Sequence, residues 1–254
     1  MKRIYQIGNG IAFVSMIIVN YLSNTGMMNN TTIGDISNSI DSKLTPAGYT
    51  FAIWGLIYLL LFVFIIRQGS SLFLSSGDDS FVNKTGWWFI ISCLFNSLWV
   101  IVWIYGYVGI SCIILFLLLY SIFKIILVNE IALTNLDSAN KLMLWTPFVV
   151  YAGWVTVASI VNVSAYLVSI SWGSLGISEP LWTQFMLLIA VLIIIIVSHK
   201  RGLILYGLVG SWALIGIANA NSDEMSNVEL IAYIGASILL LDSVFIFYKK
   251  NFPK

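Results

Sequence analysis

Residues 86–128 read GWWFIISCLFNSLWVIVWIYGYVGISCIILFLLLYSIFKIILV, two apolar runs joined by the turn Tyr105-Gly106-Tyr107. The only charged residue in this stretch is Lys124. A helix needs about 20 mostly apolar residues to cross the hydrocarbon core of a bilayer. The runs are continuous rather than alternating, which favours helices over transmembrane strands. The stretch therefore predicts an antiparallel pair of membrane-spanning helices.

The composition of the whole chain agrees with a membrane protein. Its 254 residues are 59% hydrophobic and 9% charged, with a mean hydropathy of +0.95, whereas soluble domains are about 25% charged. The 12 Lys and Arg nearly balance the 11 Asp and Glu. Nucleic-acid binding would need a basic excess, and a disordered tail would need net charge. We therefore expect an integral membrane protein with no nucleic-acid partner.

Eight apolar runs are long enough to be membrane spans. The first follows a basic N-terminus, as a signal peptide would, but it contains three amide side chains and lacks a small-residue cleavage pattern, so we interpret it as a retained span. The predicted spans are roughly residues 4–23, 49–66, 86–105, 107–128, 142–168, 182–198, 202–219 and 228–248.

The basic residues predict the orientation, because Lys and Arg are enriched on the cytoplasmic side of membrane proteins. With eight spans, Lys43 stands alone on one side, and eleven basic residues lie on the other. We therefore expect cytoplasmic termini and an outer loop at 24–48. The heavy use of Ile, Asn and Lys suggests a bacterial source, so the membrane would be a bacterial plasma membrane. The eleven are Lys2, Arg3, Arg67, Lys84, Lys124, Lys141, Lys200, Arg201, Lys249, Lys250 and Lys254.

Three predicted helical faces combine aromatic and amide side chains. Their members are three or four residues apart and so share one side of a helix, and the rise of about 1.5 Å per residue places all three near the middle or in the outer half of the membrane. Aromatic walls with a few polar groups are typical of a small-molecule pocket. In the alternative interpretation these groups only satisfy each other and hold helices together. The faces are Trp54 with Tyr58, Asn96 with Trp99, and Trp154 with Ala158 and Asn162.

Two charged residues fall inside predicted spans, Lys124 in the fourth and Asp242 in the eighth. Charges within a membrane often mark functional sites. Alternatively, Lys124 extends to the interface and Asp242 pairs with Lys249 or with a neighbouring helix.

Residues for conventional catalysis are scarce. No HExxH, CxxC or G-x-S-x-G pattern occurs, and no span holds a carboxylate pair. Cys93 and Cys112 lie inside spans, where a cysteine usually acts as a small apolar filler. The sequence therefore assigns no catalytic or metal-binding residue, and an enzyme is the less favoured interpretation.

The chain resembles the translocator protein family, also called tryptophan-rich sensory or TspO/MBR proteins. The matches are Trp54-x-x-x-Tyr58, Asn96-x-x-Trp99, Trp154-x-x-x-Ala158-x-x-x-Asn162, and a long first loop ending in Pro46. The chain departs from the family pattern in the spacing of Phe51 before Trp54 and of Pro147 before Trp154, and in having a single proline ahead of the second span.

The resemblance implies an all-α membrane fold with a five-helix bundle over 1–168, including the outer loop 24–48, and it leaves 169–254 as a three-helix extension of one membrane domain. It also implies binding of a porphyrin, sterol or other planar apolar molecule between the second, third and fifth spans. The ligand residues would be those of the three aromatic and amide faces. No resident cofactor is assigned, and a metal-free porphyrin is favoured over ligated haem because no His or Cys within a span is placed to hold the iron.

Three functions follow from these observations. The first is a ligand-binding sensor or translocator-like protein. The second is a secondary transporter that uses Lys124 and Asp242, and the third is a membrane enzyme acting on the bound ligand. The expected partners are the lipid bilayer, a small planar or apolar ligand and, as an open option, a second copy of the chain in a homodimer.

Overall fold

The computed structural model describes residues 2–72, 80–222 and 227–252, and these residues form helices without a strand. Lys254, counted above among the basic residues, lies outside the described residues. The expected all-α membrane fold is confirmed. The main helices are α1 (Lys2–Asn24), α3 (Ile53–Gly69), α5 (Trp88–Ile104), α6 (Val108–Val128), α8 (Thr146–Ser169), α9 (Glu179–Arg201), α10 (Ile204–Ala220) and α11 (Asn227–Asn251).

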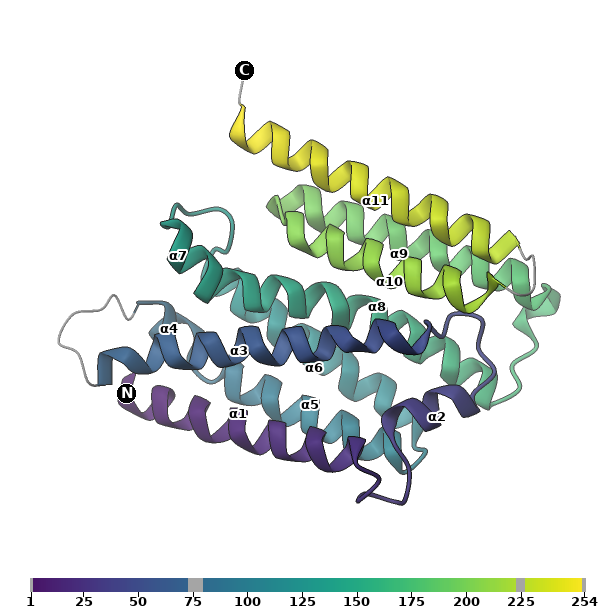
Figure 1. Cartoon of the computed structure of the whole chain (residues 1–254), viewed down its shortest axis with the longest axis horizontal. Coiled ribbons are helices and arrows are strands. Elements are labelled where there is room, and N and C mark those ends of the chain that lie inside the picture. The colour runs from purple at the N-terminus through teal and green to yellow at the C-terminus, as the bar shows by residue number, and fades with distance from the viewer. Residues whose placement is uncertain (1, 73–79, 223–226, 253–254) are drawn as a thin grey trace. The chain divides into compact units, whose positions relative to one another are not determined.

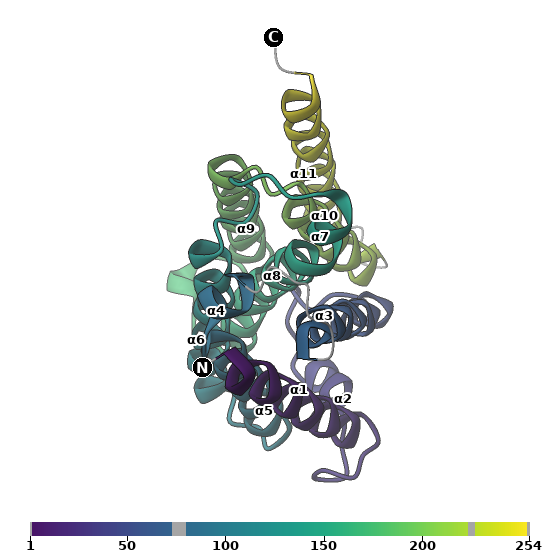
Figure 2. The ribbon, with the colours of Figure 1, turned by 90° about the vertical axis from the view of Figure 1, so that its left-hand side faces the viewer.

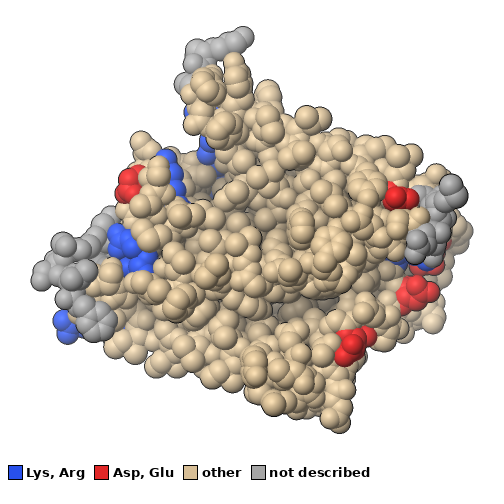
Figure 3. Space-filling model, viewed as in Figure 1, with Lys and Arg blue, Asp and Glu red and all other residues tan. Residues whose placement is uncertain are grey.

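Each predicted span corresponds to one of these helices. Six helical stretches are long and apolar enough to cross a membrane, and two further apolar helices, α5 and α10, have 17 residues each. Seventeen residues is the lower end of the length of a membrane span, about 25 Å at 1.5 Å per residue. On the face shown in Figure 3, the charged side chains gather at the ends of helices, and the long sides show no Lys, Arg, Asp or Glu.

The described helices group into two compact units. Unit 1 consists of residues 1–36 and 54–152, and unit 2 consists of residues 37–53 and 153–254. Helix α8 contributes to both units, and so does the loop 24–48. The division at residue 168 that the sequence suggests stays a prediction.

Helix α1 buries the amides Gln6, Asn9 and Asn20 and exposes aliphatic side chains, as expected of a helix that faces lipid. Ile4, Ile11 and Val14 are more than half exposed. The buried stripe repeats every three or four residues, which keeps it on one side of the helix. This stripe packs toward α5 and the end of α3 (Figure 2). It consists of Gln6, Asn9, Phe13, Met16, Asn20 and Ser23.

Helices α5 and α6 form the hairpin predicted from residues 86–128. The turn needs Gly106, whose φ of +76° is accessible to glycine at little cost. The amide of Tyr107 donates to the carbonyl of Val102 at 2.9 Å. The two helices therefore return antiparallel through a three-residue turn.

The first half of the loop 24–48 is ordered against the end of α5 within unit 1. Helix α2 (Ile33–Ser39) begins with reciprocal bonds between Thr32 and Asp35, in which each backbone amide donates to the other side chain (2.9 and 3.1 Å). The indole of Trp103 donates to the carbonyl of Ile33 at 3.2 Å. This part of the loop thus contains a short helix that is bonded to α5, and it is not a free linker.

The second half of the loop is bound by α10 within unit 2. The amide of Ala47 donates to the carbonyl of Gly216 at 2.9 Å, and the indole of Trp212 donates to the carbonyl of Thr50 at 3.2 Å. Asn221 at the end of α10 donates to the carbonyl of Lys43 at 3.0 Å. A 3-10 turn, Gly48–Ala52, then leads into α3. Helix α10 and the residue that follows it therefore bind the segment that precedes α3.

Helices α9, α10 and α11 lie side by side in unit 2 (Figure 1). Small residues allow close packing of membrane helices. A Cβ added at Gly207 would meet Ser243 Oγ at 2.4 Å, and one added at Gly235 would meet Leu214 Cδ2 at 2.7 Å. The glycines of these helices are therefore contact positions.

Replacing Gly216 by Ala should destabilise the protein by about 1–3 kcal/mol, the usual cost of overpacking. The new Cβ would lie 2.1 Å from Oγ1 and 2.8 Å from Cγ2 of Thr50, which is fully buried. Thermal unfolding in detergent measures the loss.

The matched control is Gly10→Ala in α1, where a Cβ meets nothing within 4 Å. It should leave the unfolding midpoint unchanged or slightly higher, because Ala favours helix over Gly. Equal midpoints for both variants would contradict the described contact between α10 and Thr50.

Candidate functional site

A chain of hydrogen bonds links four side chains from four helices of unit 1. The Tyr58 hydroxyl in α3 donates to Asn20 Oδ1 in α1 at 2.6 Å, and Asn20 Nδ2 donates to Asn96 Oδ1 in α5 at 2.7 Å. Asn96 Nδ2 then donates to the hydroxyl oxygen of Tyr151 in α8 at 2.8 Å. Asn20 is 4% exposed and Asn96 0%. An unpaired amide is costly in an apolar interior, and this chain satisfies both amides.

The direction of these bonds leaves one donor at the end of the chain. Tyr58, Asn20 and Asn96 each donate to the next member, so Tyr151 accepts a bond and keeps its own hydroxyl proton. Within the described part of the chain, that proton has no acceptor. The polar chain therefore ends in a buried hydrogen-bond donor.

Aromatic rings surround this polar chain. The ring of Trp54 is stacked 5.6 Å from that of Tyr58 and 5.8 Å from that of Trp99, with interplanar angles of 24° and 28°. It meets Tyr151 edge to face at 6.0 Å, and Trp99 in turn stacks on Trp103 at 6.2 Å. Offset and edge-to-face contacts of this kind stabilise by about 0.5–1.5 kcal/mol each beyond the area they bury.

The structure therefore brings together four of the seven predicted ligand residues: Trp54, Tyr58, Asn96 and Trp99. It adds two residues that the sequence reasoning missed. Asn20 could have been found as an amide within an apolar run, and Tyr151 because it stands three residues before Trp154 and shares its helical face.

The other three predicted residues lie on the unit 2 part of α8. Trp154 and Asn162 are buried, at 3% and 4% exposed, and Ala158 between them is partly exposed. The ring of Trp154 meets that of Phe51 edge to face at 6.0 Å. The three share one side of the helix as predicted, and their part in ligand binding stays a prediction.

The two interpretations of these residues can be compared within unit 1. The bond between Asn20 and Asn96 is the kind of interhelical contact expected if these groups only satisfy each other and hold helices together. The stack of rings and the remaining donor of Tyr151 are features that a ligand pocket would also have, so the ligand site stays a prediction. Both roles can coexist when a polar chain fixes the rings that a ligand meets.

A separate cavity of about 390 Å³ lies in unit 2 beside the second half of the loop. Asp41 and Lys43 line it from the loop, and Trp172 and Trp182, whose rings meet edge to face at 4.7 Å, line it from the region before and at the start of α9. None of the seven predicted ligand residues lines this cavity.

Lys124 lies against aromatic rings of unit 1. Its Nζ is 5.4 Å from the centre of the Tyr120 ring and 5.7 Å from that of Trp88. A cation over an aromatic face is stabilised by the ring quadrupole. This contact agrees with an interfacial lysine better than with a charge buried among apolar groups.

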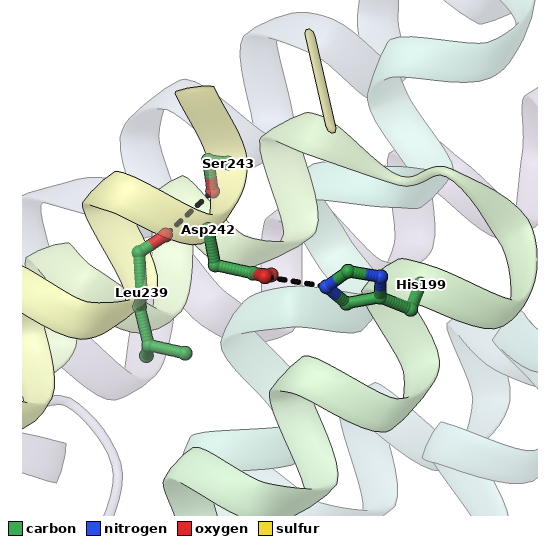
Figure 4. A network of polar contacts seen from close by, with 4 residues as sticks. All are labelled: His199, Leu239, Asp242 and Ser243. Carbon is green, nitrogen blue, oxygen red and sulfur yellow. Dashed lines mark hydrogen bonds and ion pairs between the residues drawn. The ribbon is translucent and has the colours of Figure 1, made fainter. Parts of the chain in front are cut away.

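Asp242 contacts a histidine rather than a lysine. Its Oδ1 lies 2.5 Å from Nε2 of His199, at the end of α9 (Figure 4). The side chains are 13% and 43% exposed, respectively. Asp242 Oδ2 is buried and has no hydrogen-bond partner among the described residues. The sequence analysis considered Lys249 or a neighbouring helix as the partner of Asp242, and it did not identify His199.

Metal ligands do not cluster in the described ranges, since no group of three or more His, Cys, Asp or Glu could hold an ion there. Cys93 and Cys112 are both buried, and neither forms a disulfide. The contacts observed along the polar chain are hydrogen bonds and ring stacking.

Replacing Asn20 or Asn96 by Ala should lower stability, because each change leaves a buried partner unsatisfied. A double-mutant cycle should give a coupling of about 1 kcal/mol, near the values found between membrane helices. Unfolding by SDS in bicelles measures it. Ser97→Ala is the control, since Ser97 bonds only to the carbonyl of Cys93 in its own helix. Zero coupling, or an equal loss in the control, would contradict the described chain.

Comparison with known proteins agrees with the resemblance. The family model of TSPO-like proteins matches residues 6–245, which extends beyond 1–168 and includes the C-terminal helices. No curated protein and no solved structure matches the chain. Since the matched region covers most of the 254 residues, the chain belongs to the TSPO-like protein family.

Proposed function

We propose that this protein binds a planar, apolar small molecule of the porphyrin class and acts as a membrane sensor or translocator rather than as an enzyme. Membership of the TSPO-like family suggests a membrane ligand-binding or transport function. The proposed ligand residues are Trp54, Tyr58, Asn96, Trp99, Trp154, Ala158 and Asn162, with Tyr151 added from the structure.

The stacked rings carry the proposal. Trp54 lies within 6.0 Å of three other aromatic rings, and two of these contacts are nearly parallel. A flat conjugated molecule can stack on such a surface, since offset-stacked rings attract each other. Indole groups also lose little conformational freedom on binding, because packing already fixes them.

The end of the polar chain supports the same ligand class. The hydroxyl proton of Tyr151 needs an acceptor, and a porphyrin carries carboxylates and ring nitrogens that can supply one. A bond formed in this apolar interior is stronger than the same bond in water. Asn96 fixes the tyrosine oxygen at 2.8 Å and so orients the donor.

Quenching of tryptophan fluorescence by protoporphyrin tests this proposal in detergent-solubilised protein. Wild type should bind saturably, and Asn96→Ala combined with Trp154→Ala should weaken binding by at least about tenfold, which corresponds to ~1.4 kcal/mol. A change in porphyrin absorbance on binding provides a second readout that does not depend on the number of tryptophans.

The matched control is Trp172→Ala, which removes a tryptophan of unit 2 that meets Trp182 edge to face and is not among the proposed ligand residues. It should reduce the fluorescence signal and leave the affinity unchanged. Equal affinity in the double variant and in wild type, or no saturable binding, would exclude the proposed site.

The contact between Asp242 and His199 favours a second candidate, a secondary transporter coupled to protons. Carboxylates and histidines form proton relays in membrane transporters. The buried second oxygen of Asp242 provides a further site for a proton. The basic residues Lys200 and Arg201 directly follow His199.

Accumulation of protoporphyrin in proteoliposomes with an imposed pH gradient tests this candidate. Asp242→Asn keeps the size of the side chain and removes the titratable group, so gradient-driven accumulation should fall to the level of empty liposomes. Lys200→Gln removes an adjacent charge without touching the pair and should retain accumulation. Unchanged accumulation in Asp242→Asn would reject the relay.

A further inference from the structure

A second cavity, of about 190 Å³, lies within unit 1 at the basic ends of its helices. Its inner wall is buried and apolar except for one amide, and its rim is exposed and polar. The buried wall contains Phe81, Asn129, Leu144 and Trp145, and the rim and sides contain Arg67, Ser80, Lys84, Thr134, Leu136 and Asn140.

Two cations from different elements line this cavity, and among the described residues no carboxylate does. Arg67 comes from the last turn of α3 and Lys84 from α4 (Ser80–Thr85). The guanidinium Nε of Arg67 donates to Asn140 Oδ1 at 3.0 Å, which holds the side chain in place. The cavity therefore has the charge of an anion site.

The nearby carboxylate of Asp137 is engaged on Asn140 rather than lining the cavity. It accepts from the backbone amide of Asn140 at 2.9 Å and from Nδ2 at 2.6 Å. Bonds from the Asn140 amide hold the pKa of Asp137 below its usual value. Asp137 thus holds Asn140 in place, and Asn140 in turn holds Arg67.

Asn129 presents an unused acceptor in the buried wall. Its Nδ2 donates to Thr85 Oγ1 at 2.9 Å and to the carbonyl of Ile125 at 3.0 Å, so the orientation of the amide is set. Its Oδ1 is buried and has no hydrogen-bond partner in the described residues. A ligand that fits this site would bring a hydroxyl as well as a negative charge, because an unmet acceptor costs about 1–3 kcal/mol.

The helix that supplies the apolar wall is locally distorted. Residues Lys141–Trp145 form a π-helical turn before α8, and two of them, Leu144 and Trp145, line the cavity. Such turns occur frequently at functional sites, because they cost stability and re-aim side chains. The distortion is an independent sign that this wall is shaped for an occupant.

We propose that this cavity binds a hydroxylated phosphate ester, with Arg67 and Lys84 holding the phosphate and Asn129 Oδ1 accepting a bond from the hydroxyl. The head group of a glycerol or inositol phospholipid has this chemistry, and so does a soluble polyol phosphate. Basic pockets between membrane helices bind anionic head groups. The apolar wall of Phe81, Leu144 and Trp145 can contact the part of a lipid next to its phosphate.

The experiment uses the full chain in nanodiscs. It measures the midpoint of thermal unfolding and, separately, the lipid that stays bound in native mass spectrometry. Four probes are compared: phosphatidylcholine alone, added phosphatidylglycerol, added phosphatidic acid, and soluble glycerol 3-phosphate. Phosphatidylglycerol should raise the unfolding midpoint and be retained more than phosphatidic acid, whose head group is a bare phosphate without the glycerol alcohols that reach Asn129 Oδ1. A response to glycerol 3-phosphate as well would show that the soluble ester is also a ligand.

Two pairs of variants make the test specific. Arg67→Gln with Lys84→Gln should lower retention of phosphatidylglycerol by about tenfold, whereas Arg3→Gln with Lys249→Gln, an equal loss of charge elsewhere, should not. Asn129→Ala should abolish the preference for phosphatidylglycerol over phosphatidic acid. Thr85→Val removes the same internal bond but leaves Asn129 Oδ1 in place, and it should keep that preference.

The proposal is overturned if the wild-type protein retains neither phosphatidylglycerol in preference to phosphatidylcholine nor glycerol 3-phosphate. It is also overturned if both charge-neutralising pairs lose lipid equally, since general surface electrostatics would then account for the binding.

Discussion

Unit 1 depends on the cost of leaving a polar side chain unpaired in an apolar surrounding. Helix α1 presents isoleucine and valine outward and a stripe of amides inward, so its orientation is set by the need of these amides for partners. Gln6 donates to the carbonyl of Gln68 at 2.5 Å, and Asn9 donates to Gln68 Oε1 at 2.8 Å. At the other end Asn20 joins Tyr58 and Asn96. These bonds fix both the rotation of α1 and the positions of the aromatic rings next to Tyr58.

The same constraint explains where the charged groups lie. Lys124 lies against the rings of Trp88 and Tyr120, and Asp242 has His199 beside it. Each charge thus has a specific neighbour, as expected where solvation by water is limited. Arg67 is held by Asn140 at the basic end of α3. In the described part of the chain, these polar contacts help to orient helices and candidate ligand sites.

Much of the fold follows from hydropathy, because the apolar runs mark the helices and their lengths approach the thickness of a bilayer. The grouping of Trp54 with Tyr58 and of Asn96 with Trp99 also follows from spacing, since it depends only on the period of one helix. Contacts between helices do not follow in this way. Asn20 and Asn96 are 76 residues apart, and His199 and Asp242 are 43 apart. Periodicity shows which residues share one face of a helix. It does not show which faces of two helices meet, because that depends on how each helix is rotated about its axis. The π-helical turn at Lys141–Trp145 was not predicted, because the apolar run over 142–168 indicates a helix but not its local hydrogen-bond pattern.

The binding of residues 43–50 by α10 has a consequence for biosynthesis. Thr50 receives its bond from Trp212, 162 residues later, and the carbonyl of Lys43 receives its bond from Asn221, 178 residues later. A ribosome makes about 5–20 residues per second, so the segment before the second span waits on the order of ten seconds or more for these partners. During that time its polar backbone groups depend on water, lipid head groups or a chaperone. Assembly of this segment is therefore completed only after the last helices have been made, although the segment itself is among the first parts of the chain to be synthesised.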